Sequence, residues 1–171
     1  MAQLSTLGVF TTLMPLTTHL LREASATDAE ADYVAVELLW NVLVKAAHAK
    51  HDRDEYGRLL LLIADLSAAQ VAAFVQDHSV DTLLNLQPPL ETVLADRHER
   101  LQAQRAADEL ATIRASRVAE PNKAAVALLS VLKRIRNKRI HGFKTPDGPR
   151  DAEILGAARP LLRVLCHSLI H

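Results

Sequence analysis

Apolar residues recur every three or four positions along most of this chain, which is the spacing of helices that bury one face. Ala and Leu dominate the composition, as they do in helical proteins. The pattern predicts an all-α fold of six or seven helices, with one further helical turn at residues 81–86. The predicted helices cover residues 5–23, 27–50, 54–66, 67–76, 90–117, 121–141 and 151–170.

Local signals mark several of these helix ends. The segments 27–30 and 67–70 have the Ser/Thr-x-x-Glu/Gln form of a capping box, in which two side chains satisfy two free amides at a helix start. Pro121 is tolerated in the first turn of a helix, and Gly142 is a natural stop. The helix over 121–141 therefore has a predicted start signal in Pro121 and a predicted stop signal in Gly142.

Length and composition indicate one domain over residues 1–171, long enough to bury a core without disulfides or metals. Hydrophobic residues make up 49% of the chain and only five glycines occur, which favours helices over short strands with tight turns. Aromatic residues make up only 4%. This scarcity argues against a surface that binds single strands by stacking bases, but not against contacts to phosphates.

The sequence predicts a cytoplasmic protein with no membrane partner. No uninterrupted apolar run approaches the roughly 20 residues of a membrane span. The apolar stretch 4–21 lacks a basic leader and is broken by Pro15 and six Ser or Thr residues, so we interpret it as a core helix rather than a signal peptide. Cys166 is the single cysteine, which excludes an internal disulfide, and its apolar neighbours predict a small buried side chain.

Charge is balanced overall but unevenly distributed. Residues 1–96 hold 5 basic and 13 acidic side chains, whereas residues 97–150 hold 13 basic and 5 acidic ones. The basic excess falls on the predicted helices 90–117 and 121–141, where it would attract a polyanion such as RNA. A long helix also needs a solvated charged face, and that explanation stays open for 97–117.

The segment Arg136-Asn137-Lys138-Arg139-Ile140-His141 carries the candidate chemistry. Helical spacing places Asn137 and His141 on one face, with Arg136 beside it. Arg136 offers a permanently charged fork to phosphate oxygens, His141 can donate or accept a proton, and Asn137 can orient the imidazole. On RNA, the 2′-hydroxyl can serve as the nucleophile, which predicts a 2′,3′-cyclic phosphate product without a metal or an organic cofactor.

Further basic residues surround this segment and are candidate substrate contacts. A general surface that attracts phosphates explains them as well as specific contacts do, and so does a plain solvated face. They are Lys133, Lys138, Arg139 and Lys144.

The region 120–170 resembles the HEPN superfamily, whose signature is Arg, four to six residues, then His, often with Asn after the Arg. The match is Arg136 to His141, followed by Gly142, a compact turn and a final helix. The resemblance implies an up-and-down helical bundle and homodimers that join two motifs in one cleft. In many members it also implies metal-independent endoribonuclease activity in toxin, antiphage or RNA-processing roles.

The same resemblance implies catalytic roles for Arg136 and His141 and an auxiliary role for Asn137. Some HEPN clefts carry an additional acidic residue on an earlier helix, a role for which Glu37 is the candidate here. In the toxin branch paired with nucleotidyltransferase antitoxins, a Tyr two residues after the His is nucleotidylated. This chain has Phe143 at that position, which counts against neutralisation by that route, although an antitoxin or another protein partner is still expected.

Alternative interpretations exist for each of these residues. His141 would also be stabilised simply by lying at the negative end of a helix dipole. Glu37 is equally well explained as a buried polar group hydrogen-bonded to a neighbour such as Trp40. His48 and His51 are spaced for a metal ion, although a frayed helix end has the same appearance. For the whole chain, the alternatives are a catalytically inactive HEPN-type dimerisation or interaction module and a nucleic-acid-binding regulator.

Overall fold

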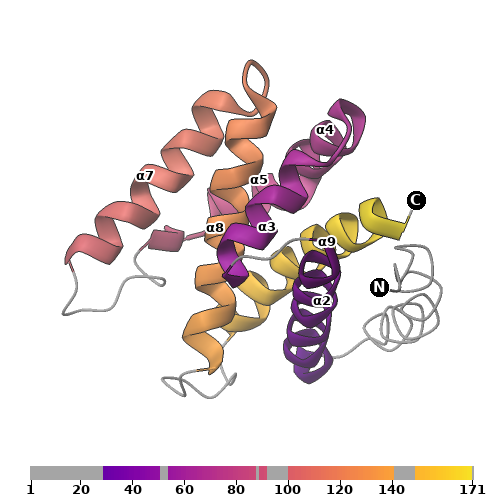
Figure 1. The fold of residues 1–171 in the computed structure, drawn as a ribbon. Coiled ribbons are helices and arrows are strands. Elements are labelled where there is room, and N and C mark those ends of the chain that lie inside the picture. Colours follow the sequence, from indigo (N-terminus) through magenta and orange to yellow (C-terminus); the bar gives the residue numbers. More distant parts are fainter. Residues whose placement is uncertain (1–28, 51–53, 88, 92–99, 141–148, 171) are drawn as a thin grey trace, which may run out of the picture.

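The structure is a computed structural model, which describes residues 29–50, 54–87, 89–91, 100–140 and 149–170. Seven helices and no strand lie in these residues, which confirms the predicted all-α fold as a helical bundle (Figure 1). The helices are α2 (Ala29–Lys50), α3 (Glu55–Ala64), α4 (Ala68–Gln76), α5 (His78–Asn85), α7 (Arg100–Ser116), α8 (Pro121–Ile140) and α9 (Pro149–Ile170).

Most observed bounds agree with the predicted ones to within a few residues. α5 begins at His78, three residues earlier than predicted, because the Asp77 carboxylate accepts a hydrogen bond from the Ser79 amide at 2.8 Å and caps the helix. α9 begins two residues early, at Pro149. Four predictions lie wholly or partly outside the described residues: the helix 5–23, the capping box at 27–30, residues 92–99 of the helix 90–117, and the stop at Gly142.

The predicted capping box at the start of α4 is confirmed. Ser67 accepts a hydrogen bond from the Gln70 amide at 3.3 Å, and Gln70 Oε1 accepts one from the Ser67 amide at 2.9 Å. The same Gln70 side chain donates from Nε2 to the Ser168 carbonyl of α9 at 2.8 Å. One side chain therefore closes the start of α4 and attaches it to the last turns of α9.

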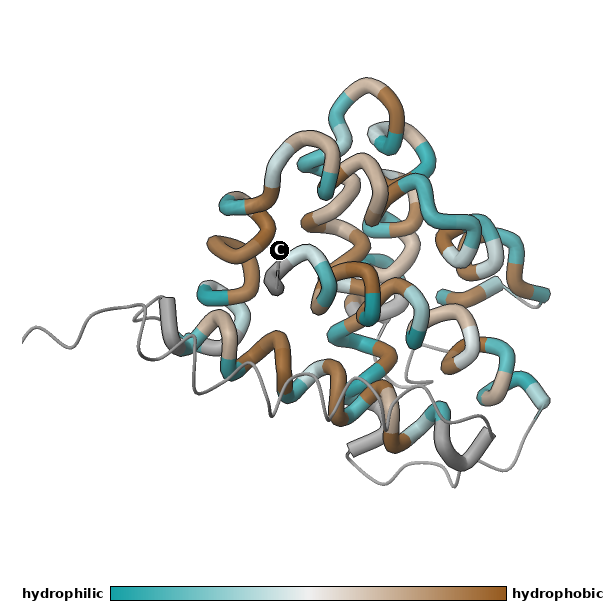
Figure 2. Tube along the Cα trace, turned by 90° about the vertical axis from the view of Figure 1, so that its right-hand side faces the viewer, coloured by the Kyte–Doolittle hydropathy of each residue, from teal (hydrophilic) through white to brown (hydrophobic). Residues whose placement is uncertain are grey.

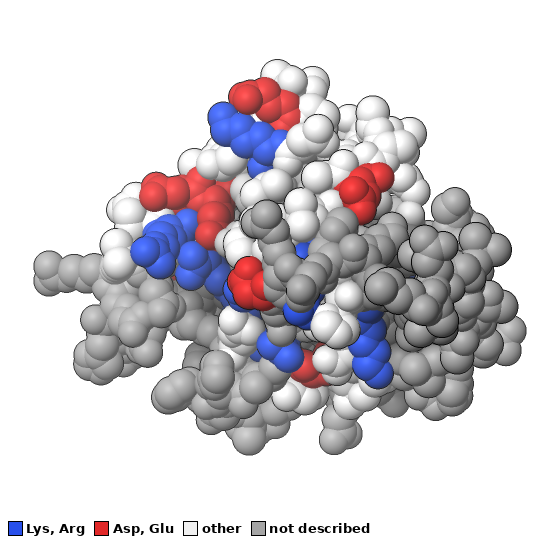
Figure 3. Space-filling view, viewed as in Figure 1, with Lys and Arg blue, Asp and Glu red and all other residues white. Residues whose placement is uncertain are grey.

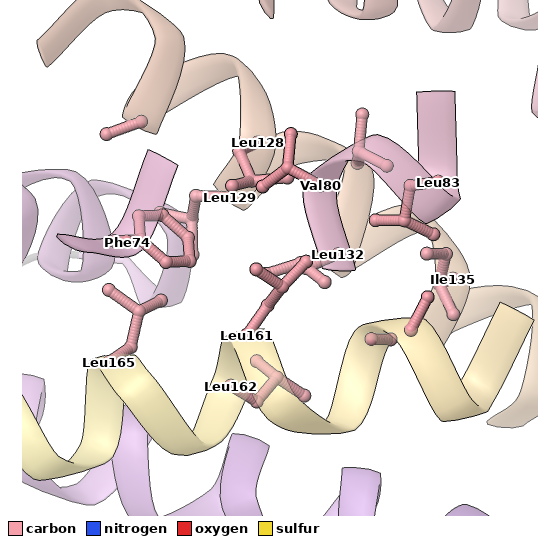
Figure 4. Packing of buried hydrophobic residues seen from close by; sticks show 14 of the residues in the cluster. Phe74, Val80, Leu83, Leu128, Leu129, Leu132, Ile135, Leu161, Leu162 and Leu165 are labelled. Atoms are coloured by element: carbon pink, nitrogen blue, oxygen red, sulfur yellow. The ribbon is translucent and has the colours of Figure 1, made fainter. Parts of the chain in front are cut away.

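One part of the core lies where α4, α5, α8 and α9 meet, and the same cluster of buried residues continues onto α2, α3 and α7. Figure 4 shows side chains from α4, α5, α8 and α9 directed toward one another. Hydrophobic and hydrophilic positions alternate along each helix in Figure 2, as expected when one face is buried. The residues labelled in Figure 4, all buried, are Phe74, Val80, Leu83, Leu128, Leu129, Leu132, Ile135, Leu161, Leu162 and Leu165.

Helix α8, which carries the motif, runs through the middle of the bundle (Figure 1). It pairs with α7 through the turn at residues 117–120 and also packs against α3, α4 and α9. α2 packs mainly on α9 and α3. No single described helix is long and apolar enough to cross a membrane; α3 and α4 pass that test only together, and the chain bends by 115° between them.

Candidate functional site

The candidate site lies in the last turns of α8. Arg136, Asn137 and Lys133 are described there with their side chains. Lys138 and Arg139 belong to the same helix, but their side chains lie outside the described part of the chain, as do the whole of His141 and Lys144. The predicted approach of His141 to Arg136 is therefore still a prediction.

Arg136 links α8 to α2. Its Nε donates to Glu37 Oε2 at 3.4 Å, and its Nη1 donates to Asn137 Oδ1 at 3.2 Å. The guanidinium carbon also lies 5.9 Å from the centre of the Trp40 ring, within the range of a cation–π contact. Glu37, Arg136 and Asn137 thus form one polar cluster between α2 and α8, in which Glu37 and Arg136 are 99 residues apart in sequence.

This cluster is partly open to solvent. The Arg136 and Glu37 side chains are 20% and 21% exposed, whereas Trp40 beneath them is fully buried. The apolar wall formed by the indole strengthens charge interactions at the cluster, because it excludes water from one side. About a fifth of the Arg136 side chain stays in contact with solvent in the folded bundle.

Glu37, the candidate for an acidic residue on an earlier helix, lies next to Arg136 in the structure. The spacing of α2 placed it at the edge of a buried face, and the structure pairs its Oε2 with Arg136. Its other carboxylate oxygen, Oε1, is buried and has no hydrogen-bond partner in the described structure. A buried acceptor in that condition loses hydration without compensation, so this carboxylate is only half satisfied.

Lys133 lies one turn before Asn137, and its Nζ stands 4.2 Å from the centre of the Tyr56 ring of α3. A cation–π contact restricts the position of an ammonium group that would otherwise move freely in solvent. Lys133 and Arg136 therefore present two ordered positive charges near the end of α8. Sequence reasoning missed Tyr56, since nothing local to α3 connects it to Lys133.

Several basic residues of the predicted basic region form ion pairs with acidic side chains. Figure 3 shows blue and red side chains next to one another on this face, without separation into a basic and an acidic half. Two of these pairs, Arg117–Asp81 and Arg136–Glu37, join the basic region to the acidic first part of the chain. Three further pairs among the described residues are Lys123–Glu120, Arg134–Glu109 and Arg150–Glu153.

Neither a metal nor a reactive thiol emerges from the described residues. Within them, no three His, Cys, Asp or Glu side chains gather as metal ligands would, and His51 of the suggested His48–His51 pair lies outside them. Cys166 is buried as predicted and lies 3.5 Å from the Leu39 carbonyl. Burial raises the pKa of its thiol to about 12, which removes the thiolate needed for nucleophilic chemistry.

Comparison of this chain with models of protein families, with curated proteins and with solved structures gives no match. The resemblance to the HEPN superfamily therefore rests on the residues from Arg136 to His141 and on their place in the helical order.

Proposed function

We propose that this protein is a metal-independent endoribonuclease of HEPN type, which acts on RNA in a toxin or antiphage role in the cytoplasm. The observation that carries the proposal is the polar cluster on α8. Arg136, the residue that the motif singles out, is oriented by Asn137 and Glu37, lies against a buried indole and is still partly open to solvent.

The chemistry requires three contributions from the protein. The 2′-oxygen attacks the adjacent phosphorus, the bond from phosphorus to the next 5′-oxygen breaks, and the products are a 2′,3′-cyclic phosphate and a 5′-hydroxyl. A base must take the 2′ proton, an acid must protonate the leaving 5′-oxygen, and a cation must stabilise the charge on the phosphoryl oxygens.

Arg136 supplies the cation in this proposal. A guanidinium has five N–H groups, and Glu37 and Asn137 use only two of its nitrogens as single donors. Its remaining N–H groups can bind two phosphate oxygens at once. Lys133, ordered on Tyr56, adds a second positive charge for the neighbouring phosphate.

His141 supplies the proton transfers. Its ordinary pKa near 6.5 lets an imidazole exchange protons at neutral pH. The residue follows directly on α8, which ends at Ile140. In a homodimer with two motifs in one cleft, one copy of His141 accepts the 2′ proton while the other protonates the leaving oxygen.

The test is incubation of the purified protein with total RNA in excess chelator, followed by end-group analysis of the fragments. We expect 2′,3′-cyclic phosphate and 5′-hydroxyl ends from the wild type, and loss of cleavage by at least about a hundredfold in His141→Ala and Arg136→Lys. Lys123→Gln, at the opposite end of α8, is the matched control and should cleave normally. Cleavage that persists at the wild-type level in His141→Ala would contradict the proposal. So would cleavage that is lost when the wild-type protein is purified further.

A second function, an inactive interaction module, is favoured by one observation. Arg136 joins α8 to α2 through its contacts with Glu37 and Trp40, which is the position of a residue that stabilises the packing of two helices. Under this alternative, Arg136→Lys lowers the melting temperature, and no variant changes the state of RNA. Light scattering of the same samples tests the proposed homodimer, which both functions share.

A further inference from the structure

Two arginines near the end of α8, which point to opposite sides of the helix, are held by carboxylates in different ways. Glu109 binds Arg134 at two points, with Nε to Oε2 at 2.8 Å and Nη2 to Oε1 at 3.1 Å. Glu37 binds Arg136 at one point only, at 3.4 Å. Charge-assisted hydrogen bonds normally lie near 2.7–2.9 Å, so the contact between Glu37 and Arg136 is a loose one.

The rest of the Glu37 environment also favours exchange. Its Oε1 has no hydrogen-bond partner in the described structure, so the carboxylate is not locked in place by other donors, as Glu109 is by Ser130. A phosphodiester carries the same negative charge as the carboxylate, but it offers Arg136 two oxygens in place of a single long contact. It therefore competes on favourable terms for the same guanidinium.

We infer that Glu37 is an internal competitor for the anion-binding position of Arg136, and that it sets how tightly the protein binds RNA. In the free protein, the carboxylate holds the guanidinium at the cluster. When RNA binds, a backbone phosphate takes over that contact. This inference rests on the proposed function, since it names the group that a substrate phosphate displaces.

The consequence is an unusual direction of effect for a residue inside a binding cluster. Glu37→Gln keeps the size of the side chain but removes the negative charge, so RNA should bind more tightly. We expect about a fivefold gain in affinity, which corresponds to roughly 1 kcal/mol of lost competition for a partly exposed ion pair. Glu37→Asp keeps the charge and should bind RNA close to the wild-type level.

Asp32 provides a matched control on the same helix. It is 18% exposed, and it pairs with Arg159 of α9 as Glu37 pairs with Arg136. Asp32→Asn therefore changes the net charge by the same amount and also removes a partly buried ion pair, but it leaves Arg136 untouched. Any gain caused by the general field of the protein appears in both variants, whereas a gain caused by competition appears only in Glu37→Gln.

The experiment measures fluorescence anisotropy of a short, labelled, 2′-O-methylated RNA, which binds but cannot be cleaved. Circular dichroism first checks that each variant is folded. Tighter binding by Glu37→Gln, with Asp32→Asn and Glu37→Asp near the wild type, supports the inference. Weaker binding by Glu37→Gln, or an equal gain in Asp32→Asn, overturns the inference and leaves the proposed function standing. Absence of binding by every variant and by the wild type overturns both.

Discussion

Arg134 and Glu109 form a two-point ion pair that joins α8 to α7, with Ser130 donating a third hydrogen bond to the same carboxylate at 2.6 Å. Both charged side chains are about four-fifths buried. The hydrogen bonds to Glu109 raise the pKa of Arg134, so the guanidinium keeps its charge at every ordinary pH. This cluster fixes the long pair of helices on which the candidate site depends.

Removal of the carboxylate should be costly. Glu109→Ala leaves a largely buried guanidinium and the Ser130 hydroxyl without their partner, and we expect a loss of about 2 kcal/mol in the free energy of unfolding. Urea denaturation at neutral pH measures it. Glu120→Ala breaks the exposed pair with Lys123 and serves as the control, with an expected change below about 0.5 kcal/mol. Equal losses in the two variants would contradict the structural role of Glu109.

The pair between Arg117 and Asp81 predicts a pH dependence. Hydrogen bonds from Arg117 hold the pKa of Asp81 below its ordinary value of 3.8. A lowered pKa in the folded state contributes stability above the unfolded value, and this contribution disappears as the pH falls through the folded value. Asp81→Asn should therefore be less stable than the wild type at pH 7, by under about 1 kcal/mol because Asp81 is largely exposed.

The difference between Asp81→Asn and the wild type should shrink as the pH falls below 3.8 and should vanish once the pH is below the lowered pKa of the folded state. Thermal melts over a pH series check this. Arg117→Gln should also lose the pH-dependent part, with an additional loss at all pH values because Arg117 donates to the Val75 carbonyl at 3.1 Å. A difference between Asp81→Asn and wild type that stays constant down to pH 2 would rule out this assignment.

Helix α8 offers one buried and one exposed aliphatic residue for a paired test of core packing. Leu132 is 1% exposed and lies in the cluster of Figure 4, whereas Val126 on the same helix is 38% exposed. We expect Leu132→Ala to cost about 2–5 kcal/mol in unfolding free energy, since it leaves a cavity, and Val126→Ala to change stability by less than about 0.5 kcal/mol. Denaturant titration of both variants decides whether α8 is buried as described.

The thiol of Cys166 gives a probe of local opening. With its pKa raised to about 12 by burial, it should resist a thiol-specific reagent at pH 8 in the folded protein. It should react at the rate of a free cysteine in strong denaturant. Fast labelling under native conditions would show that α9 separates readily from α2, where the thiol meets the Leu39 carbonyl.

Lys133 has a predicted effect on RNA binding that differs from that of a surface lysine. If it contacts a phosphate, Lys133→Gln should weaken binding to all sequences alike and reduce the slope of log affinity against log salt by about one. Lys123→Gln, at the start of the same helix, should leave the slope unchanged. Anisotropy titrations at several salt concentrations measure both slopes.

The helices were predictable because their signals are local. Ser67 and Gln70 specify a capping box within four residues, and Pro121 begins α8 as expected. The early start of α5 was not predicted, because Asp77 ends α4 and caps α5 at once, and no apolar period marks this double role. Local rules can identify Asp77 as a capping residue, but they do not show that it ends one helix and begins the next.

The candidate site was predictable in part. Spacing on α2 placed Glu37 near a buried face, and the motif identified Arg136. Their pairing could not be predicted, because the two residues are 99 positions apart and meet only through the way α2 and α8 pack. A signal was present: an acid beside the buried Trp40 needs a cation, and Arg136 follows the buried seam of Leu132 and Ile135. The uneven charge along the chain has a similar explanation, because basic residues of the second half pair with acidic residues of the first half, as Arg117 does with Asp81.

The double use of Gln70 restricts a position that general capping rules leave free. Those rules accept Glu as readily as Gln at the third position after the N-cap residue, which is Ser67 here. Here, however, the amide nitrogen donates to Ser168, while the oxygen serves the start of α4. A glutamate would set a carboxylate against a carbonyl near the negatively polarised end of α9, so this apparently conservative exchange would loosen the chain's closing helix from the rest of the molecule.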